Sequence, residues 1–307
     1  MIAVLSHVVL DEIIGAEADH AIREIGGAGA YAAVGASLAG GPNATAIVSG
    51  VGTEDRAALT EWFAEREIDS RGLFVVGSHS PRTRIHYFAD GERIETPVFG
   101  LEHFNAHTPL PEHIPHFATG LAGAYLFHDL DTEYWQSIQR FRANVHGPIL
   151  WEISATACRL GMWPAVRESM ELVDLFSINR SEALELFDTG ELDTAIDSLR
   201  IAGAVTILRC GADGSILIDG GRVTEVGVSR VDAIDPTGGG NSYSGAFLAA
   251  YAATGDPVWS ARMAAAAAAI VISHHGAPPI DSTLRTQVAG IARSISVNPR
   301  RDQEVCR

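Results

Sequence analysis

The strongest functional signal in the chain is the stretch DPTGGGNSYSGAF, residues 235–247. Apolar residues at positions 243, 246, 247, 250 and 251 recur at helical spacing, so three consecutive glycines lead directly into a helix. The first turn of a helix has unpaired backbone N–H groups and a partial positive charge, and glycine lets an anion approach them closely. Gly238, Gly239 and Gly240 therefore predict an anion-binding loop, although a simple strand-to-helix turn would have the same sequence.

Short β-branched runs alternate with longer alanine-rich segments along most of the chain. This alternation predicts a parallel sheet with helices on both faces and ligands at the carboxyl ends of its strands. The predicted strands are residues 2–9, 45–51, 124–127, 149–153, 175–178 and 204–208, and the predicted helices are residues 29–39, 56–66, 133–142, 163–172, 181–187 and 192–201. Gly255 should end the helix that follows the glycines, and Asp256 should cap the next one.

Residues 12–25 and 82–98 interrupt this alternation. The second segment alternates polar and apolar residues around Asp90-Gly91, a typical hairpin turn. Such a hairpin is either a lid or an ornament at the edge of the fold. We expect one main domain over residues 1–295, with these two segments inserted as a small β lid, and a charged tail over residues 296–307. An exposed lid edge could also pair with a second copy and form a homodimer.

The composition limits the class of protein. Of the 307 residues, 47% are hydrophobic and 20% are charged, which allows a large buried core. The formal charge of −16 argues against a nucleic-acid partner, because such surfaces need clustered Lys and Arg. Three scattered cysteines, an N-terminal run without a basic region and the lack of a long apolar stretch predict a cytoplasmic protein with no disulfide framework and no membrane segment.

Four further motifs accompany the glycine loop. They are Gly26-Gly27 before a predicted helix, INRSEA at residues 178–183, LRCGADG at residues 208–214 and HHGAPP at residues 274–279. These four motifs and the pattern D-x-T-G-x-G-x-x-x-x-G-A-F, taken in their order along the chain, resemble those of the ribokinase-like (PfkB) carbohydrate kinase family. The resemblance covers nearly the whole chain. The resemblance implies an α/β fold with a mostly parallel sheet, helices on both faces and a small β lid, and it implies ATP as a substrate.

The resemblance also implies roles for particular residues. Asp11 would hold hydroxyl groups of a small sugar or nucleoside substrate, and Gly26 and Gly27 would let that substrate lie against the backbone, next to Tyr31. The three glycines of the loop would stabilise the phosphoryl group during transfer. The residues expected to contact the nucleotide are Arg209, Gly211, Gly214, His275 and Gly276.

Two residue pairs are candidate cation sites. Asn179 and Glu182 lie three residues apart at a helix start, and the resemblance implies that they hold Mg²⁺ through water. Ordinary N-capping by Asn179 explains the same spacing. Asp235 and Thr237 would provide oxygen ligands for a monovalent cation such as K⁺, or would simply form a turn.

Four residues depart from the family pattern. Asn241 stands where the family has an aspartate that takes the proton of the attacking hydroxyl, and an amide cannot accept a proton at neutral pH. Tyr31 stands in place of an asparagine that touches substrate, and Glu152 in place of an aspartate. Arg209 replaces a threonine near the phosphates, and it could offset phosphate charge or simply pair with a surface acid.

Three functions are compatible with these residues. The leading hypothesis is an ATP-dependent phosphotransferase that acts on a hydroxyl of a sugar or a nucleoside, in which Asn241 orients the acceptor without deprotonating it. The alternatives are a nucleotide- or polyol-binding pseudokinase with a regulatory role, and a different chemistry at the same site. His128, His274 and His275 could replace the base, but each also suits a structural role.

The aromatic residues do not decide whether the acceptor is a sugar or a nucleoside. Tyr31, Phe88, Phe99 and Phe104 could stack on the base of a nucleoside, or they could form the core of the lid.

Overall fold

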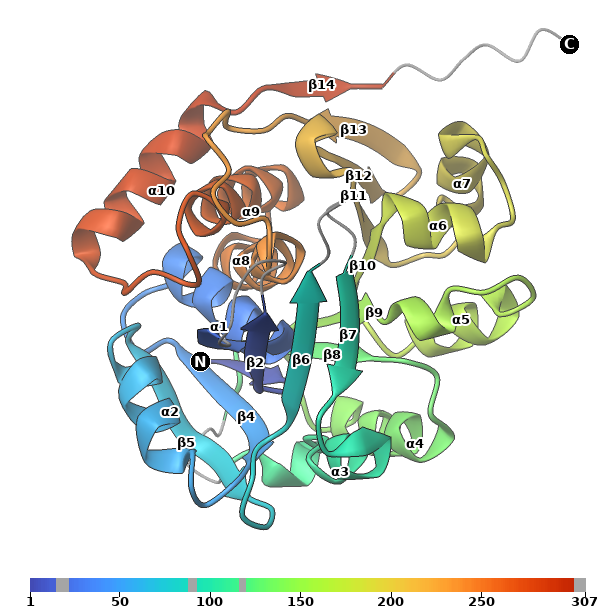
Figure 1. Cartoon of the computed structure of the whole chain (residues 1–307). Coiled ribbons are helices and arrows are strands. Elements are labelled where there is room, and N and C mark those ends of the chain that lie inside the picture. The colour runs from blue at the N-terminus through green and yellow to red at the C-terminus, as the bar shows by residue number, and fades with distance from the viewer. Residues whose placement is uncertain (15–21, 88–92, 116–119, 301–307) are drawn as a thin grey trace, which may run out of the picture.

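The fold is built around one large sheet, with a small second sheet beside it (Figure 1). The computed structural model describes residues 1–14, 22–87, 93–115 and 120–300. Within these residues the large sheet has the strand order β14-β13-β12-β11-β10-β9-β8-β1-β4-β5, and all pairs from β11 to β5 are parallel. The bounds of the strands are β1 (Ile2–Leu5), β4 (Thr45–Val51), β5 (Ile68–Val75), β8 (Gly123–His128), β9 (Ile149–Ile153), β10 (Leu175–Asn179), β11 (Val205–Arg209), β12 (Ser215–Asp219), β13 (Arg222–Val226) and β14 (Val297–Pro299).

Helices cover both faces of this sheet. Figure 1 shows α8, α9 and α10 gathered on one side and α4 to α7 on the other. Two buried apolar clusters fill the two layers, and in most strands of the large sheet alternate residues contribute to one cluster or the other. The helices are α1 (Gly27–Ala39), α2 (Arg56–Ala64), α3 (Gly100–Ala106), α4 (Thr132–Arg142), α5 (Trp163–Met170), α6 (Arg180–Leu186), α7 (Leu192–Leu199), α8 (Gly239–Thr254), α9 (Pro257–Ile272) and α10 (Ser282–Ser294). The mostly parallel α/β fold expected from the sequence is confirmed.

Small residues bring α1 and α8 into close contact beneath the site. A Cβ atom at Gly35 would overlap the carbonyl of Ser242, and one at Gly245 would overlap the carbonyl of Ala32. The two helices can therefore pack almost backbone to backbone. The far end of α8 follows the sequence prediction, because Gly255 ends it with φ 65° and the Asp256 side chain accepts hydrogen bonds from the first turn of α9.

The single strand predicted over residues 2–9 is wrong. The chain leaves the large sheet after Leu5, and a second strand, β2 (Val9–Ile14), begins in the small sheet. The backbone between them bonds elsewhere: His7 O accepts from Gly29 N (2.9 Å), and Val8 N donates to Ser49 Oγ (2.9 Å). These contacts come from α1 and β4, so an apolar pattern within one segment cannot reveal the break.

The small sheet joins the two segments that interrupted the sequence pattern. Its order is β3-β2-β6-β7, with β3 (Ile22–Gly26), β6 (Arg82–Tyr87) and β7 (Arg93–Pro97). We call it the lid sheet; it lies in front of α1 in Figure 1. Asp11 pairs with Glu24 on one side and with Thr83 on the other. The predicted turn at residues 90–91 and Phe88 lie outside the described residues.

The large sheet continues past its parallel part through three antiparallel pairs. They link β11 to β12, β12 to β13 and β13 to β14. Strand β14 lies within the segment predicted as a charged tail, where Val297 pairs with Val226 and Asn298 with Glu225. The sheet therefore extends over a part of the chain for which the sequence suggested only a tail.

Candidate active site

The glycine loop forms the opening of helix α8, as its sequence predicts. Gly238 is the N-cap and has φ 74°, in the left-handed region that favours glycine. A Cβ atom at Gly238 would overlap the ring of Tyr31, and one at Gly240 would overlap Nη1 of Arg209. The loop therefore needs glycine both for its backbone angle and for the side chains packed against it.

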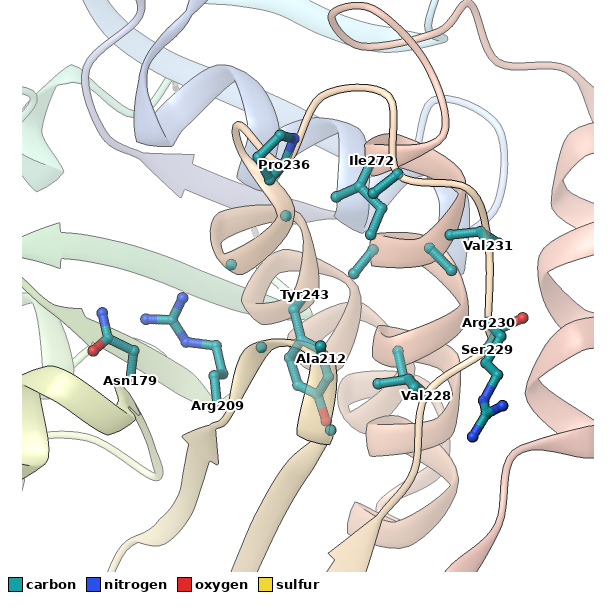
Figure 2. Close-up of a pocket in the computed structure, with 18 residues that line it drawn as sticks. Asn179, Arg209, Ala212, Val228, Ser229, Arg230, Val231, Pro236, Tyr243 and Ile272 are labelled. Carbon is teal, nitrogen blue, oxygen red and sulfur yellow. The ribbon is translucent and has the colours of Figure 1, made fainter. Parts of the chain in front are cut away.

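A cavity of about 740 Å³ leads to this opening. Figure 2 shows Arg209 and Asn179 at one end and Val228, Val231 and Ile272 along the opposite wall. The only charged residues among those that line it are Arg209 and Arg230. The lining residues are Asn179, Arg209, Gly211, Ala212, Gly214, Val228, Ser229, Arg230, Val231, Ala233, Pro236, Gly239, Gly240, Tyr243, Ala265, Ala268, Ala269 and Ile272. Apolar walls with a positive end suit a ligand that has a flat apolar part and an anionic part.

Arg209 is held at that positive end by two acidic side chains. It is the last residue of β11, and its side chain is 12% exposed. Its Nη2 lies 2.9 Å from Oε1 of Glu152 and 3.9 Å from Oε2 of Glu182. Arg209 pairs with a buried acid, not with a surface acid, and it also lines the cavity, so its role in offsetting phosphate charge stays a prediction.

Asn241 contacts the same carboxylate. Its Nδ2 donates to Oε1 of Glu152 (2.9 Å), and the hydroxyl of Tyr125 donates to Oε2 (2.9 Å). A carboxylate only accepts hydrogen bonds, so the amide nitrogen of Asn241 must face Glu152 and its carbonyl oxygen must point away. Burial, with the nearby Glu152, raises the pKa of Tyr125, which keeps this phenol protonated as a donor.

Asn179 and Glu182 form a reciprocal cap at the start of α6. Oδ1 of Asn179 accepts from Glu182 N (2.9 Å) and from Ser181 Oγ (2.8 Å), and Oε2 of Glu182 accepts from Asn179 N (2.8 Å). Burial raises the pKa of Glu182, while Arg209 opposes this shift. Within the described part of the chain, no group of three or more His, Cys, Asp or Glu side chains could hold a metal ion.

Asp235 and Thr237 form a turn before the glycines. Thr237 N donates to Oδ1 of Asp235 (2.9 Å), and Asp235 N donates to the carbonyl of Ile272 (3.1 Å). This turn fixes the approach of the chain to α8. Their role as ligands of a monovalent cation stays a prediction.

The predicted substrate residues lie together on the other side of the glycine loop. A Cβ atom at Gly26 would overlap Oδ2 of Asp11 and would lie 3.7 Å from the Tyr31 ring. Gly27 has φ 83° and lies against the carbonyl of His7. Tyr31 is 3% exposed, and burial, with nearby carboxylates, raises its pKa. After the roles that the sequence predicts for them, we call Asp11, Gly26, Gly27 and Tyr31 the acceptor side, and the cavity the nucleotide side.

Other predicted residues lie apart from the cavity lining. His275 is exposed, and Gly276 lies near Glu24 of the lid sheet, with a Cβ position 3.7 Å from Oε2 of Glu24. The His128 ring stacks on Tyr134 with 3.7 Å between ring centroids, and His274 contacts the carbonyl of Ile270 (2.7 Å). The contacts of His128 and His274 are those of structural residues.

The aromatic candidates of the lid region stack on histidines. Phe104 stacks on His7 with 3.9 Å between ring centroids, and Phe99 stacks on His79 at 5.0 Å. These rings therefore already have partners within the chain.

Sequence reasoning missed most of the cavity wall. Val228 and Val231 follow β13 in a loop, and Ala268 and Ile272 lie on α9. These residue types are those of an ordinary core. Only the packing of α9 beside β12 and β13 places them around a cavity. Tyr125 was missed for the same reason, since a tyrosine within a buried strand carries no sign of its partner.

Comparisons with known proteins agree with this architecture. The model of the pfkB family of carbohydrate kinases matches residues 5–283. The cytidine kinase of Thermococcus kodakarensis is 23% identical over 258 residues, which cover 81% of this chain and 88% of that protein. None of the helices in the described part of the chain is long and apolar enough to cross a membrane.

Two solved structures show the same fold. Adenosine kinase from Sinorhizobium meliloti aligns with a TM-score of 0.73 at 19% identity, over 95% of this chain and 98% of that chain. Aminoimidazole riboside kinase from Salmonella enterica, solved with aminoimidazole riboside and an ATP analogue, aligns with a TM-score of 0.72 at 18% identity, over 94% of this chain and 100% of that chain. With a family match over residues 5–283, this chain belongs to the pfkB family of carbohydrate kinases.

Proposed function

We propose that this protein is an ATP-dependent phosphotransferase that acts on a hydroxyl of a sugar or a nucleoside. The observation that carries the proposal is the cavity of about 740 Å³ that ends at the opening of α8. Its apolar walls suit a purine ring, and Gly239, Gly240 and Arg209 lie where the phosphates would extend. The names of the relatives, which include cytidine and adenosine kinases, support the class of acceptor.

In this proposal Asn241 orients the acceptor. Glu152 holds its amide nitrogen, so the carbonyl oxygen of Asn241 would accept a hydrogen bond from the attacking hydroxyl. The hydroxyl oxygen bonds to the γ-phosphorus as the bond to the β-phosphate oxygen breaks, and the hydroxyl proton passes to an oxygen of the transferred group. Positioning and electrostatic stabilisation supply most of the catalysis of phosphoryl transfer, so a rate loss of about 10²–10⁴-fold from the missing base leaves measurable turnover.

The family implies Mg²⁺ and a monovalent cation, and the residues expected to hold Mg²⁺ fit this ion poorly. Oδ1 of Asn179 already accepts two hydrogen bonds, and Oε2 of Glu182 accepts one and faces Arg209. Oδ1 of Asp235 accepts from Thr237 N. We therefore assign no step of the reaction to a metal held by these side chains.

The second candidate function is a pseudokinase that binds nucleotide without transferring phosphate. The observation that favours it is the double change on the acceptor side, where Asn241 has no carboxylate to offer and Tyr31 packs against Gly238. A different chemistry at the same site would also explain Asn241. Retention of the glycine loop and of the cavity favours a protein that still binds nucleotide.

The test is ATP turnover with a panel of nucleosides, including cytidine and adenosine, and of sugars, for the wild type and for Asn241→Asp. We expect slow, acceptor-dependent formation of ADP by the wild type. ATP binding without turnover in either protein would establish the pseudokinase. Turnover in Asn241→Asp alone would show that the scaffold is competent and that only the base is missing. Absence of nucleotide binding in both proteins would exclude the whole class.

A homodimer through the lid sheet belongs to the same proposal. The order β3-β2-β6-β7 leaves β3 and β7 at the two edges of that sheet, where a second copy could add its own strand. The molar mass in solution, measured by light scattering, tests this: about twice 32.6 kDa supports the dimer, and 32.6 kDa excludes it.

A further inference from the structure

Arg209 places a cation at the opening of a helix. Its guanidinium lies against Cα of Gly240, in the first turn of α8, where the partial charge of the helix is already positive. An arginine in this position repels the helix end unless acidic groups compensate. Glu152 and Glu182 provide this compensation, at 2.9 Å and 3.9 Å from Nη2.

The guanidinium is incompletely satisfied by the protein. Nε of Arg209 is buried and has no hydrogen-bond partner within the described residues. An unpaired buried donor costs about 1–3 kcal/mol, more when the group is charged. Arg209 also lines the cavity, so an anion that entered at this end would meet its charge and the backbone N–H groups of α8 together.

The neighbouring carboxylates are engaged by partners within the chain. Glu152 accepts from Tyr125, Asn241 and Arg209 together, and Glu182 is joined to Asn179 in the cap of α6. Between the two carboxylates lies the guanidinium. Arg209 thus screens the negative charges of both carboxylates from the cavity. It also presents positive charge to the cavity, which a divalent ion would otherwise supply to the phosphates.

We infer that Arg209 is a built-in cation for the terminal phosphates of the nucleotide, and that nucleotide binding by this protein does not require a divalent metal ion. The inference rests on the proposed function, since it places the nucleotide in the cavity. Guanidinium groups suit this role because they bind phosphate oxygens through two parallel hydrogen bonds.

The experiment is titration calorimetry of ATP in buffer with Mg²⁺ and in buffer with EDTA. For the wild type we expect dissociation constants within about threefold of each other. Arg209→Met keeps much of the length of the side chain and removes its charge, and we expect it to weaken binding in EDTA by at least about tenfold. The control is Arg142→Met, which removes an ion pair with Asp174 (2.8 Å). Asp174 directly precedes β10, whereas Asn179 of the cavity lies at the opposite end of the same strand. Arg142→Met should leave ATP binding unchanged.

Arg209→Met leaves Glu152 buried beside fewer partners, so the variant could fail to fold. Arg209→Met/Glu152→Gln removes the charge on both sides, and Arg209→Lys keeps the charge without the paired donors. Circular dichroism identifies the folded variants. We expect the double variant to bind ATP as weakly as Arg209→Met in EDTA, and Arg209→Lys to bind between it and the wild type.

Wild-type binding that occurs only with Mg²⁺ would overturn the inference and leave the proposed function intact. Tight binding in EDTA by a folded Arg209→Met or double variant would also overturn it. Absence of ATP binding by the wild type in both buffers would remove the inference together with the proposed function.

Discussion

The nucleotide side of the site contains a cavity, whereas on the acceptor side two side chains pack closely against glycines. The nucleotide side is a cavity of about 740 Å³ between α9, the loop after β13 and the opening of α8. On the acceptor side the Asp11 carboxylate lies against Gly26, and the buried ring of Tyr31 fills the space in front of Gly238. The glycine loop is the boundary between the two sides.

This difference separates what the backbone provides from what the side chains provide. On the nucleotide side, N–H groups of glycines and apolar walls are compatible with many sequences, and Arg209 adds a side chain that we propose binds the phosphates. On the acceptor side, individual groups decide which hydroxyl is held and whether it loses its proton. The departures that the resemblance implies at Tyr31, Glu152, Arg209 and Asn241 lie along or beside the boundary, so we predict that both the acceptor step and the binding of the phosphates differ from the family pattern.

The largest loss of stability should come from adding a side-chain atom to the glycine loop, the boundary between the two sides. Gly238→Ala adds a Cβ atom to a left-handed residue that packs on Tyr31, and we expect a loss of more than about 3 kcal/mol in the free energy of unfolding. Gly255→Ala is the matched control at the other end of α8, with φ 65° and nothing within 4 Å of the new atom. It should cost about 1 kcal/mol. Urea unfolding of both variants measures the difference, and equal losses would show that Tyr31 does not fill the boundary.

A smaller effect on stability should come from the protonation of His7. Its pH dependence reports how well the region around this histidine excludes water. Burial lowers the pKa of His7 to about 3, and the ring contacts the carbonyl of Phe104 (3.0 Å). The fold stabilises the neutral ring, so between pH 6.5 and 3 the unfolded chain binds more protons than the folded chain. The free energy of unfolding should therefore fall by about 2 kcal/mol from this residue alone as the pH drops from 7 to 5.

His7→Gln keeps a donor for Phe104 and has no proton to gain, so its stability should fall less steeply over the same range. The control is His146→Gln, which replaces an exposed histidine and should follow the wild type. Parallel curves for His7→Gln and the wild type would show that His7 is accessible to water in the folded protein.

The smallest effect should come from removing the hydroxyl of Tyr31. Tyr31→Phe keeps the ring that packs on Gly238, and we expect a change of less than about 1 kcal/mol in stability and less than about twofold in ATP affinity. A change in the preferred acceptor without a change in ATP affinity would sharpen the division into two sides. A large loss of ATP affinity would break it, because the hydroxyl would then serve the nucleotide.

The sequence was informative where one residue type is required by local geometry. The glycine loop at the start of α8, the end of that helix at Gly255 and the cap formed by Asp256 follow from motifs in the chain. The alternation of apolar runs was enough for β4, β8, β9, β10 and β11, but the parallel edge strand β5 was not predicted, and the first strand breaks where His7 and Val8 bond to α1 and β4.

Partnerships between distant residues were beyond the sequence. Nothing in the letters shows that Arg209, Glu152 and Asn241 meet, because they come from β11, β9 and α8 and are brought together only by the strand order. Strand β14 was missed because a three-residue strand has too short a pattern to recognise.

The central claim, that backbone amides and Arg209 at the opening of α8 bind the terminal phosphates, is tested most directly by one series of calorimetric titrations. The ligands are adenosine, AMP, ADP and ATP, with the wild-type protein. We predict that affinity rises as phosphates are added, with ATP at least about tenfold tighter than adenosine. Equal affinities across the series, or tighter binding of adenosine, would contradict it, because the phosphates would then lie away from the helix opening.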